Sequence, residues 1–154
     1  MAQVNRPNLD RRETQCGATI IVVDDDQHML DLYQDVLRSR IGANVLATTD
    51  PFVALQAAVR RSPDLFITDL FGPDEPDGFD RIRYLRDHTA TSTIPILVIT
   101  GNGRYRDALE VGADRVMKKP FKLDTMIECA KLLISRNMTG KVSGEEPRTN
   151  GLSC

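Results

Sequence analysis

The sequence predicts an α/β domain built around a parallel sheet, and three observations support this prediction. Short apolar runs rich in β-branched residues alternate with longer segments in which apolar residues recur every three or four positions. Glycine, proline or a carboxylate interrupts the chain at most junctions between the two kinds of segment. The apolar runs scarcely alternate with polar residues, as is typical of strands buried on both faces. Strands and helices in turn therefore predict a parallel sheet covered by helices on both sides.

Five strands and five helices follow from these patterns. The expected strands are residues 18–23, 44–48, 65–70, 94–99 and 115–118. The expected helices are residues 28–40, 51–62, 78–88, 104–111 and 122–135. Asp50 and Pro51 give the clearest helix start, because a capping carboxylate followed by proline at the first helical position favours initiation. In the helix at 78–88, Phe79, Ile82 and Leu85 face inward and the arginines are expected outside.

Right-handed crossovers leave few topologies for five parallel strands, and the commonest is the flavodoxin-like, doubly wound order 2-1-3-4-5. In that order the first and third strands are neighbours. Asp24 and Asp25 follow the first strand and Asp69 lies at the end of the third, so the three carboxylates are expected to converge at one edge of the sheet. Thr100 and Lys119 end the fourth and fifth strands at the same edge.

Three converging carboxylates need a cation or must take up protons, because two like charges about 4 Å apart repel by roughly 4 kcal/mol at an effective dielectric near 20. Magnesium suits oxygen ligands and is often shared between carboxylates and a phosphate. Thr100 can donate a hydrogen bond, Gly101 leaves room, and the Lys119 ammonium can neutralise a phosphate oxygen. A carboxylate such as Asp69 can attack phosphorus, so the pattern predicts a site for one phosphoryl group.

Composition sets the remaining expectations. The net charge of -2 gives no reason to expect nucleic acid as a partner, and no apolar run approaches the roughly 20 residues that span a bilayer. Cys16, Cys129 and Cys154 lack a paired or metal-ligand spacing, so we expect reduced, incidental thiols and a cytoplasmic location. Residues 1–16 are expected to form a flexible leader, residues 17–136 the folded domain, and residues 137–154 a disordered tail.

Four segments in this order and spacing resemble the receiver domain of bacterial two-component response regulators, from about Ala18 to Arg136. The matching segments are Val22-Val23-Asp24-Asp25-Asp26, Asp64-Leu65-Phe66-Ile67-Thr68-Asp69, Ile94-Pro95-Ile96-Leu97-Val98-Ile99-Thr100-Gly101, and Gly112-Ala113-Asp114 leading to Lys118-Lys119-Pro120-Phe121. The resemblance implies that Asp69 is the phosphoacceptor. It implies that Asp25 is a direct magnesium ligand, that the Phe71 backbone carbonyl is a further ligand, and that Asp24 acts in the same pocket through water. It also implies that Thr100 is the switch hydroxyl and that Lys119 is the phosphate-binding lysine. It also implies a cis peptide bond between Lys119 and Pro120.

The chain departs from the receiver pattern in three places. The loop from Phe71 to Gly78 is one residue longer and more acidic than usual. Val116 stands where receivers carry Tyr or Phe, so we expect phosphorylation to be signalled through the loop after Thr100 and the helix at 104–111 rather than through a rotating ring. In receiver domains, side chains at the positions of Phe71 and Asn102 influence the attack of water on the acyl phosphate. The resemblance therefore implies that the apolar, bulky Phe71 slows self-dephosphorylation relative to a polar residue.

The resemblance implies a stand-alone module, which is not a conventional enzyme but catalyses its own phosphorylation and dephosphorylation. Its expected partners are a histidine kinase or phosphotransfer protein and an unknown output protein, without nucleic acid or membrane, as a monomer or a phosphorylation-dependent dimer. Three alternatives remain open. The chain could be a receiver excised from a longer regulator or hybrid kinase, a metal-dependent phosphotransfer enzyme for small molecules, or a flavin-binding protein, which the acidic first loop disfavours.

Overall fold

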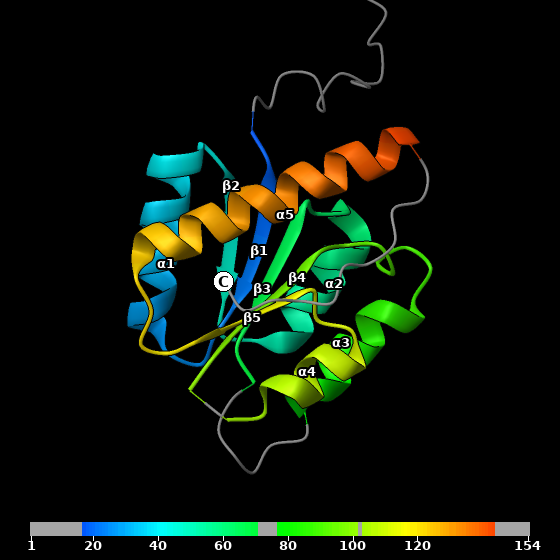
Figure 1. Ribbon diagram of the computed structural model, residues 1–154, viewed down its shortest axis with the longest axis horizontal. Coiled ribbons are helices and arrows are strands. Elements are labelled where there is room, and N and C mark those ends of the chain that lie inside the picture. Colours follow the sequence, from blue (N-terminus) through cyan, green and yellow to red (C-terminus); the bar gives the residue numbers. More distant parts are fainter. Residues whose placement is uncertain (1–16, 71–76, 102, 144–154) are drawn as a thin grey trace, which may run out of the picture.

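The computed structural model describes residues 17–70, 77–101 and 103–143 (Figure 1). Its strands are β1 (Thr19–Val23), β2 (Asn44–Thr48), β3 (Leu65–Thr68), β4 (Ile96–Thr100) and β5 (Arg115–Lys118). Its helices are α1 (Gln27–Ile41), α2 (Pro51–Arg61), α3 (Asp77–Asp87), α4 (Tyr105–Val111) and α5 (Leu123–Ser143). The strands pair in parallel in the order β2-β1-β3-β4-β5, which confirms the predicted flavodoxin-like fold with five helices.

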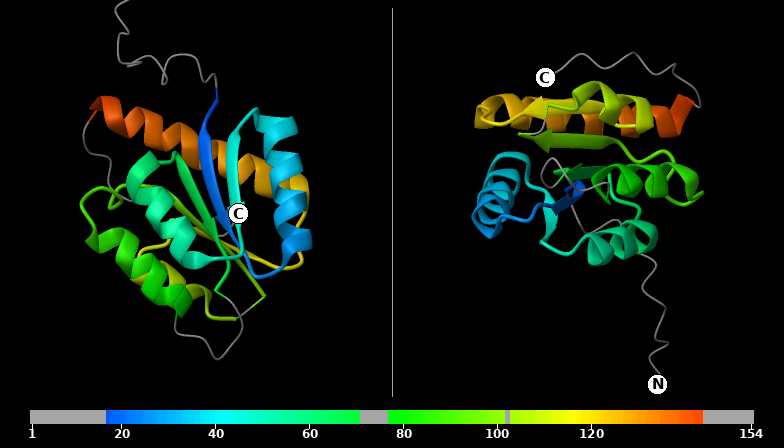
Figure 2. Two further views of the ribbon diagram at one scale, coloured as in Figure 1. Left: turned by 180° about the vertical axis from the view of Figure 1, so that it is seen from behind. Right: turned by 90° about the horizontal axis from the view of Figure 1, so that it is seen from below.

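The sheet separates two hydrophobic clusters. Helices α1 and α5 cover one face and helices α2, α3 and α4 cover the other (Figures 1 and 2). Successive residues of a strand point to opposite faces, so Ile20 and Val22 belong to the first cluster while Ile21 and Val23 belong to the second. Every residue of β3 and β4 is buried. This explains why the sequence of these two strands scarcely alternates.

Local signals end and begin the helices as the sequence predicts. Asp26 caps α1, since its carboxylate accepts a hydrogen bond from the His28 backbone N–H at 2.9 Å. Asp50 caps α2 in the same way, and Pro51 occupies its first turn. Gly42 follows α1 with φ of 72°, a left-handed conformation that glycine adopts without steric penalty. Helix α1, which follows Asp24 and Asp25 in the chain, therefore has a capping residue at each end.

Three expectations differ from the structure. Helix α5 continues to Ser143 rather than ending at Ser135. Each added residue of a helix gains a backbone hydrogen bond, which explains how polar residues extend it. The arginines of α3 are not all outside, because Arg81 is 3% exposed and Arg86 is half-buried. Cys129 is disulfide-bonded, so the expectation of incidental thiols is wrong there.

Among the described residues, no helix has both the length and the apolar character needed to cross a bilayer. The expected leader, and the part of the tail from residue 144 onward, lie outside the described residues.

Candidate functional site

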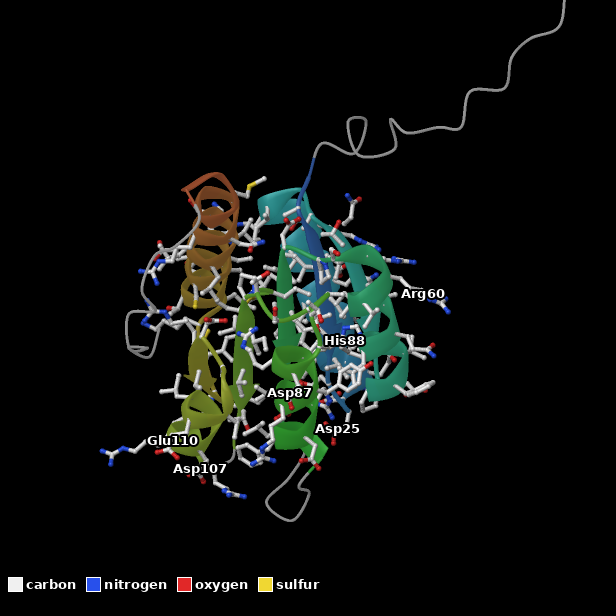
Figure 3. All side chains as sticks on the ribbon, turned by 90° about the vertical axis from the view of Figure 1, so that its right-hand side faces the viewer. Asp25, Arg60, Asp87, His88, Asp107 and Glu110 are labelled. Carbon is white, nitrogen blue, oxygen red and sulfur yellow. The ribbon has the colours of Figure 1, made fainter. Side chains whose placement is uncertain are left out.

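Three carboxylates converge at the carboxyl ends of β1 and β3. Asp24 and Asp25 directly follow β1, Asp69 directly follows β3, and the two strands are neighbours with Val23 opposite Thr68. One oxygen from each carboxylate lies within 4.8 Å of the others. Asp24 is 1% exposed and Asp69 is 9% exposed, whereas Asp25 is exposed at the end of the molecule where the strands terminate (Figure 3). The predicted convergence is confirmed.

Lys119 joins this cluster from the end of β5. Its ammonium group donates hydrogen bonds to Asp24 Oδ2 at 2.9 Å and to Asp69 Oδ2 at 2.8 Å. The Lys119 backbone N–H donates to the carbonyl of Thr100 at 3.0 Å, which ties the end of β5 to the end of β4. The Lys119–Pro120 peptide bond is cis, as the resemblance implies. Residues from four segments of the chain therefore meet at one edge of the sheet.

Burial and charge act in opposite directions on the pKa of Asp24, and they also oppose each other on the pKa of Lys119. Burial raises the pKa of Asp24, although hydrogen bonds from the Asp26 N–H and from Lys119 offset part of that rise. Burial alone would lower the pKa of Lys119, but the hydrogen bonds and charges of Asp69 and Asp24 outweigh it, and the Lys119 pKa is raised. The lysine therefore remains an ammonium at neutral pH.

The backbone around Asp69 fixes the orientation of its carboxylate. The Leu70 N–H donates to Asp69 Oδ1 at 2.6 Å, while Oδ2 faces Lys119. The Asp69 N–H donates to the carbonyl of Val23 at 3.1 Å, which continues the pairing of β1 with β3. Both carboxylate oxygens thus have a donor within the described part of the chain.

Three of the remaining predicted site residues can be placed in the structure, and two lie outside its described part. Thr100 is 1% exposed at the end of β4, next to the Lys119 backbone. A Cβ added to Gly101 would meet no atom within 4 Å, so this position faces open space, as expected. Val116 is 4% exposed within the cluster that α2, α3 and α4 cover. Phe71 and Asn102 lie outside the described residues, so the predictions about them stay predictions.

Two residues near the site were not singled out from the sequence. Arg81 of α3 donates to the Thr68 hydroxyl oxygen at 2.6 Å and to the backbone carbonyl of Asp69 at 2.9 Å. The sequence position of Thr68 could have indicated such a contact, because a polar side chain within a buried apolar strand requires a hydrogen-bond partner. Tyr33 of α1 is 1% exposed, and burial raises the pKa of its phenol. The negative charges of Asp24, Asp69 and Asp26 raise this pKa further. Its hydroxyl therefore stays protonated at neutral pH.

A doubly wound parallel sheet with three carboxylates and a lysine at its carboxyl edge defines a class of α/β domains suited to hold a divalent cation beside an anionic group. The model of the response regulator receiver domain family matches residues 20–131. The chain belongs to this family.

Curated relatives agree with the family match. The transcriptional regulatory protein GltR of Pseudomonas aeruginosa is 34% identical over 131 residues, which cover 83% of this chain and 53% of GltR. The alkaline phosphatase synthesis transcriptional regulatory protein PhoP of Bacillus subtilis is 33% identical over 129 residues, which cover 82% of this chain and 52% of PhoP. The chain thus spans about half the length of the curated relatives it matches.

Solved structures agree with the fold. A putative response regulator from Chloroflexus aurantiacus is 30% identical with a TM-score of 0.70, and the match covers 78% of this chain and 99% of that one. The receiver domain of the sensor histidine kinase PA1611 from Pseudomonas aeruginosa is 26% identical with a TM-score of 0.69, over the same shares of the two chains. That structure has a magnesium ion coordinated in its active-site cleft.

Proposed function

We propose that Asp69 of this receiver domain accepts a phosphoryl group in a magnesium-dependent reaction, and that the phosphorylated domain changes its binding to a partner protein. The observation that carries the proposal is the Lys119 ammonium, which hydrogen-bonds to both Asp24 and Asp69 while Asp25 lies in the same cluster. An ordinary surface lysine beside a turn would have no reason to be held by two carboxylates from different strands.

The donor set fits a magnesium ion. Asp24, Asp25 and Asp69 offer only carboxylate oxygens, and Mg²⁺ prefers hard oxygen ligands. The proposed ligands are these three residues and the backbone carbonyl of Phe71, which lies outside the described residues. When bound, the ion would neutralise negative charge on an incoming phosphoryl group. The magnesium in the PA1611 receiver domain supports this assignment.

The chain's own residues supply the remaining chemistry. A carboxylate oxygen of Asp69 forms a bond to phosphorus as the bond between phosphorus and the donor's leaving group breaks, which yields an aspartyl phosphate. The Lys119 ammonium is placed to neutralise a phosphoryl oxygen, and Thr100 with Gly101 would receive another oxygen beside it. Subsequent attack by water would release phosphate, so the domain would catalyse both the gain and the loss of its phosphoryl group.

Response regulators act with histidine kinases and output domains, and several relatives are named as DNA-binding regulators. We propose a histidine kinase or phosphotransfer protein as the phosphodonor for this chain. Its output partner would be a protein, which residues 17–136 contact without binding nucleic acid or membrane themselves. The cytoplasmic location, the expected domain boundaries and the choice between monomer and phosphorylation-dependent dimer stay predictions.

Incubation with acetyl phosphate and magnesium tests the proposal. Intact-mass spectrometry should detect one phosphoryl equivalent on the parent protein and none on Asp69→Asn or after chelation of the metal. Asp80→Asn is the matched control, because Asp80 is an exposed carboxylate of α3 that pairs only with Arg83 in the described structure. It should be phosphorylated like the parent. Unaltered phosphorylation of Asp69→Asn would refute the assignment, and rapid continuous release of phosphate would favour the small-molecule phosphotransfer enzyme.

A further inference from the structure

We propose that Arg81 is a positioning residue for the acceptor carboxylate, acting through the peptide group that joins Asp69 to Leu70. The inference rests on the proposed function, because it concerns the same acceptor. Arg81 lies in α3 and is 3% exposed, so its guanidinium group lies inside the fold. Arginine is seldom buried to this extent unless its donors are engaged. The atoms that the guanidinium contacts should therefore explain why Arg81 is buried.

Two hydrogen bonds place the guanidinium behind the acceptor. Arg81 Nη1 donates to the Thr68 hydroxyl oxygen at 2.6 Å and to the Asp69 backbone oxygen at 2.9 Å. The Thr68 hydroxyl donates in turn to the same backbone oxygen at 2.8 Å. The carbonyl of Asp69 thus accepts from two donors, one of which is charged, and charge-assisted hydrogen bonds are the stronger kind.

The other end of this peptide group holds the carboxylate. The Leu70 N–H donates to Asp69 Oδ1 at 2.6 Å. A peptide group is planar, so donors that fix the direction of its carbonyl also fix the direction of its N–H. A cation on the carbonyl also polarises the amide and strengthens the N–H as a donor. Arg81 therefore acts on Oδ1 across one peptide plane and leaves Oδ2 on the side of Lys119.

The packing of α3 makes this contact possible. A Cβ added to Gly78 would lie 2.7 Å from the Leu70 Cα, so the first turn of α3 lies directly against the Leu70 backbone. Arg81 is three residues further along the helix and on the same face as Gly78. The close approach at Gly78 brings Arg81 within reach of the preceding residue, Asp69. Phosphoryl transfer depends on alignment, and a misplacement of about 1 Å can lower a rate about 100-fold.

A spectroscopic test needs neither metal nor phosphodonor. In a ¹H–¹⁵N spectrum, the short hydrogen bond of the Leu70 amide should place its proton resonance downfield. Arg81→Met should move that resonance upfield, and Arg81→Lys should restore part of the shift because an ammonium can engage one acceptor. Arg83→Met is the matched control, since Arg83 lies on the same helix with a side chain that is 54% exposed. It should leave the Leu70 resonance in place.

A kinetic test complements the spectrum. With acetyl phosphate and saturating magnesium, Arg81→Met should lower the rate constant of phosphorylation about tenfold. Arg83→Met should match the parent. Thr68→Val provides a second variant of nearly the same shape. It removes the hydroxyl that accepts a hydrogen bond from Arg81 and donates one to the Asp69 carbonyl. This variant should also move the Leu70 resonance upfield.

The outcomes separate this inference from the proposed function. A parent protein that takes up no phosphoryl group refutes the proposed function. A parent that is phosphorylated, together with folded variants whose Leu70 resonance and rate constant are unchanged, refutes the role of Arg81 alone. If Arg81→Met fails to fold, unchanged values in Thr68→Val and Arg81→Lys refute it equally.

Discussion

The ammonium group of Lys119 provides the positive charge in the acidic pocket. It is the hydrogen-bond partner common to Asp24 and Asp69, and it offsets part of the repulsion between their carboxylates. Its side chain is 25% exposed, so an anion from solvent can reach it. A group that already neutralises carboxylates at the sheet edge can neutralise a phosphoryl oxygen there without a large rearrangement.

Replacement of this lysine tests its role. Lys119→Met should lower the rate constant of phosphorylation about 10²- to 10³-fold, the usual effect of removing one preorganised donor to a transition state. Magnesium affinity should not fall, because the change removes a competing cation and keeps every carboxylate. Mass spectrometry at timed intervals would measure the rate constant, and isothermal titration calorimetry would measure the magnesium affinity. Lys118→Met is the control, since Lys118 is exposed; equal rates for the two variants would contradict the prediction.

At the residue scale, the sequence predicted that the three carboxylates, Thr100 and Lys119 lie at one edge of the sheet. A carboxylate directly after a buried apolar run is visible in one dimension, and parallel strand order then brings such residues together. Arg81 could not be predicted in this way. Charged residues on an amphipathic helix normally face solvent, and only the spatial position of Thr68 and the Asp69 carbonyl explains the burial of this one.

Helix α3 is fixed to the sheet by a second arginine. Arg86 donates to the backbone oxygens of Ser92, Ile94 and Gly112, and its Nη2 lies 2.7 Å from Asp114 Oδ2. The same carboxylate oxygen accepts from the Ile96 N–H at 2.8 Å. One side chain thereby joins the end of α3, the start of β4 and the turn after α4. The predicted outward arginine is a structural tie between elements.

Removal of this tie should destabilise the fold. Arg86→Met should lower the free energy of unfolding by about 2–4 kcal/mol, because it leaves Asp114 and several carbonyls without their charged donor. Urea denaturation would measure the change. Arg83→Met removes an exposed ion pair with Asp80 on the same helix and should change stability by no more than about 0.5 kcal/mol. Similar losses for the two variants would contradict the structural role of Arg86.

Helix α4 is the element expected to report phosphorylation. It has only seven residues, and Val116 of β5 is buried against the cluster that Ala108 and Tyr105 of α4 also join. Valine has no ring that could rotate between two positions. After beryllofluoride treatment, hydrogen exchange should change over residues 103–111 and stay unchanged in β5.

Val116→Tyr provides the matching variant. The added ring should cost about 1–3 kcal/mol of stability in this packed position. Partner affinity and its dependence on phosphorylation should stay unchanged, as binding measurements with and without beryllofluoride would show. A strong gain in switching would count against signalling through α4.

On the scale of the whole molecule, the acidic pocket opposes stability. Asp24 is nearly fully buried and its pKa is raised above the ordinary 3.8, so the folded protein holds this proton more tightly than the unfolded chain does. By linkage, the resulting penalty is present above the raised pKa and disappears as the pH falls through it toward 3.8. Without added metal, Asp24→Asn should therefore raise the free energy of unfolding at pH 7.

Magnesium should reverse this penalty. At about 100 times its dissociation constant, a ligand that binds only the folded state adds about 2.7 kcal/mol. The gain should shrink as the pH falls toward the raised pKa of Asp24, because protons compete for the carboxylate. Urea titrations at pH 8 and pH 5, with and without magnesium, would show this. Asp25→Asn should lose the gain and Asp80→Asn should keep it; an equal gain at both pH values would contradict the prediction.

The elements could be predicted because each carried its own signal, from the Asp50-Pro51 helix start to the continuous apolar runs of β3 and β4. The strand order then followed from right-handed crossovers and the commonest topology for five parallel strands. The end of α5 could not. Its residues after Asn137 have the composition of a tail, and no local stop signal distinguishes a helix that continues from one that ends. The disulfide at Cys129 was equally invisible, since bond formation depends on distance in space rather than on spacing.

The sheet lies between the two hydrophobic clusters of the described residues (Figure 2), and the reactive groups lie at strand ends rather than in either helical layer. Sequence drift on the outer surface of α1 and α5, or of α2, α3 and α4, thus need not disturb the acceptor chemistry. A lineage could exchange one recognition surface for another by altering solvent-facing helix positions alone. Domains of this fold can therefore differ in the partners they bind while they keep the same reaction centre.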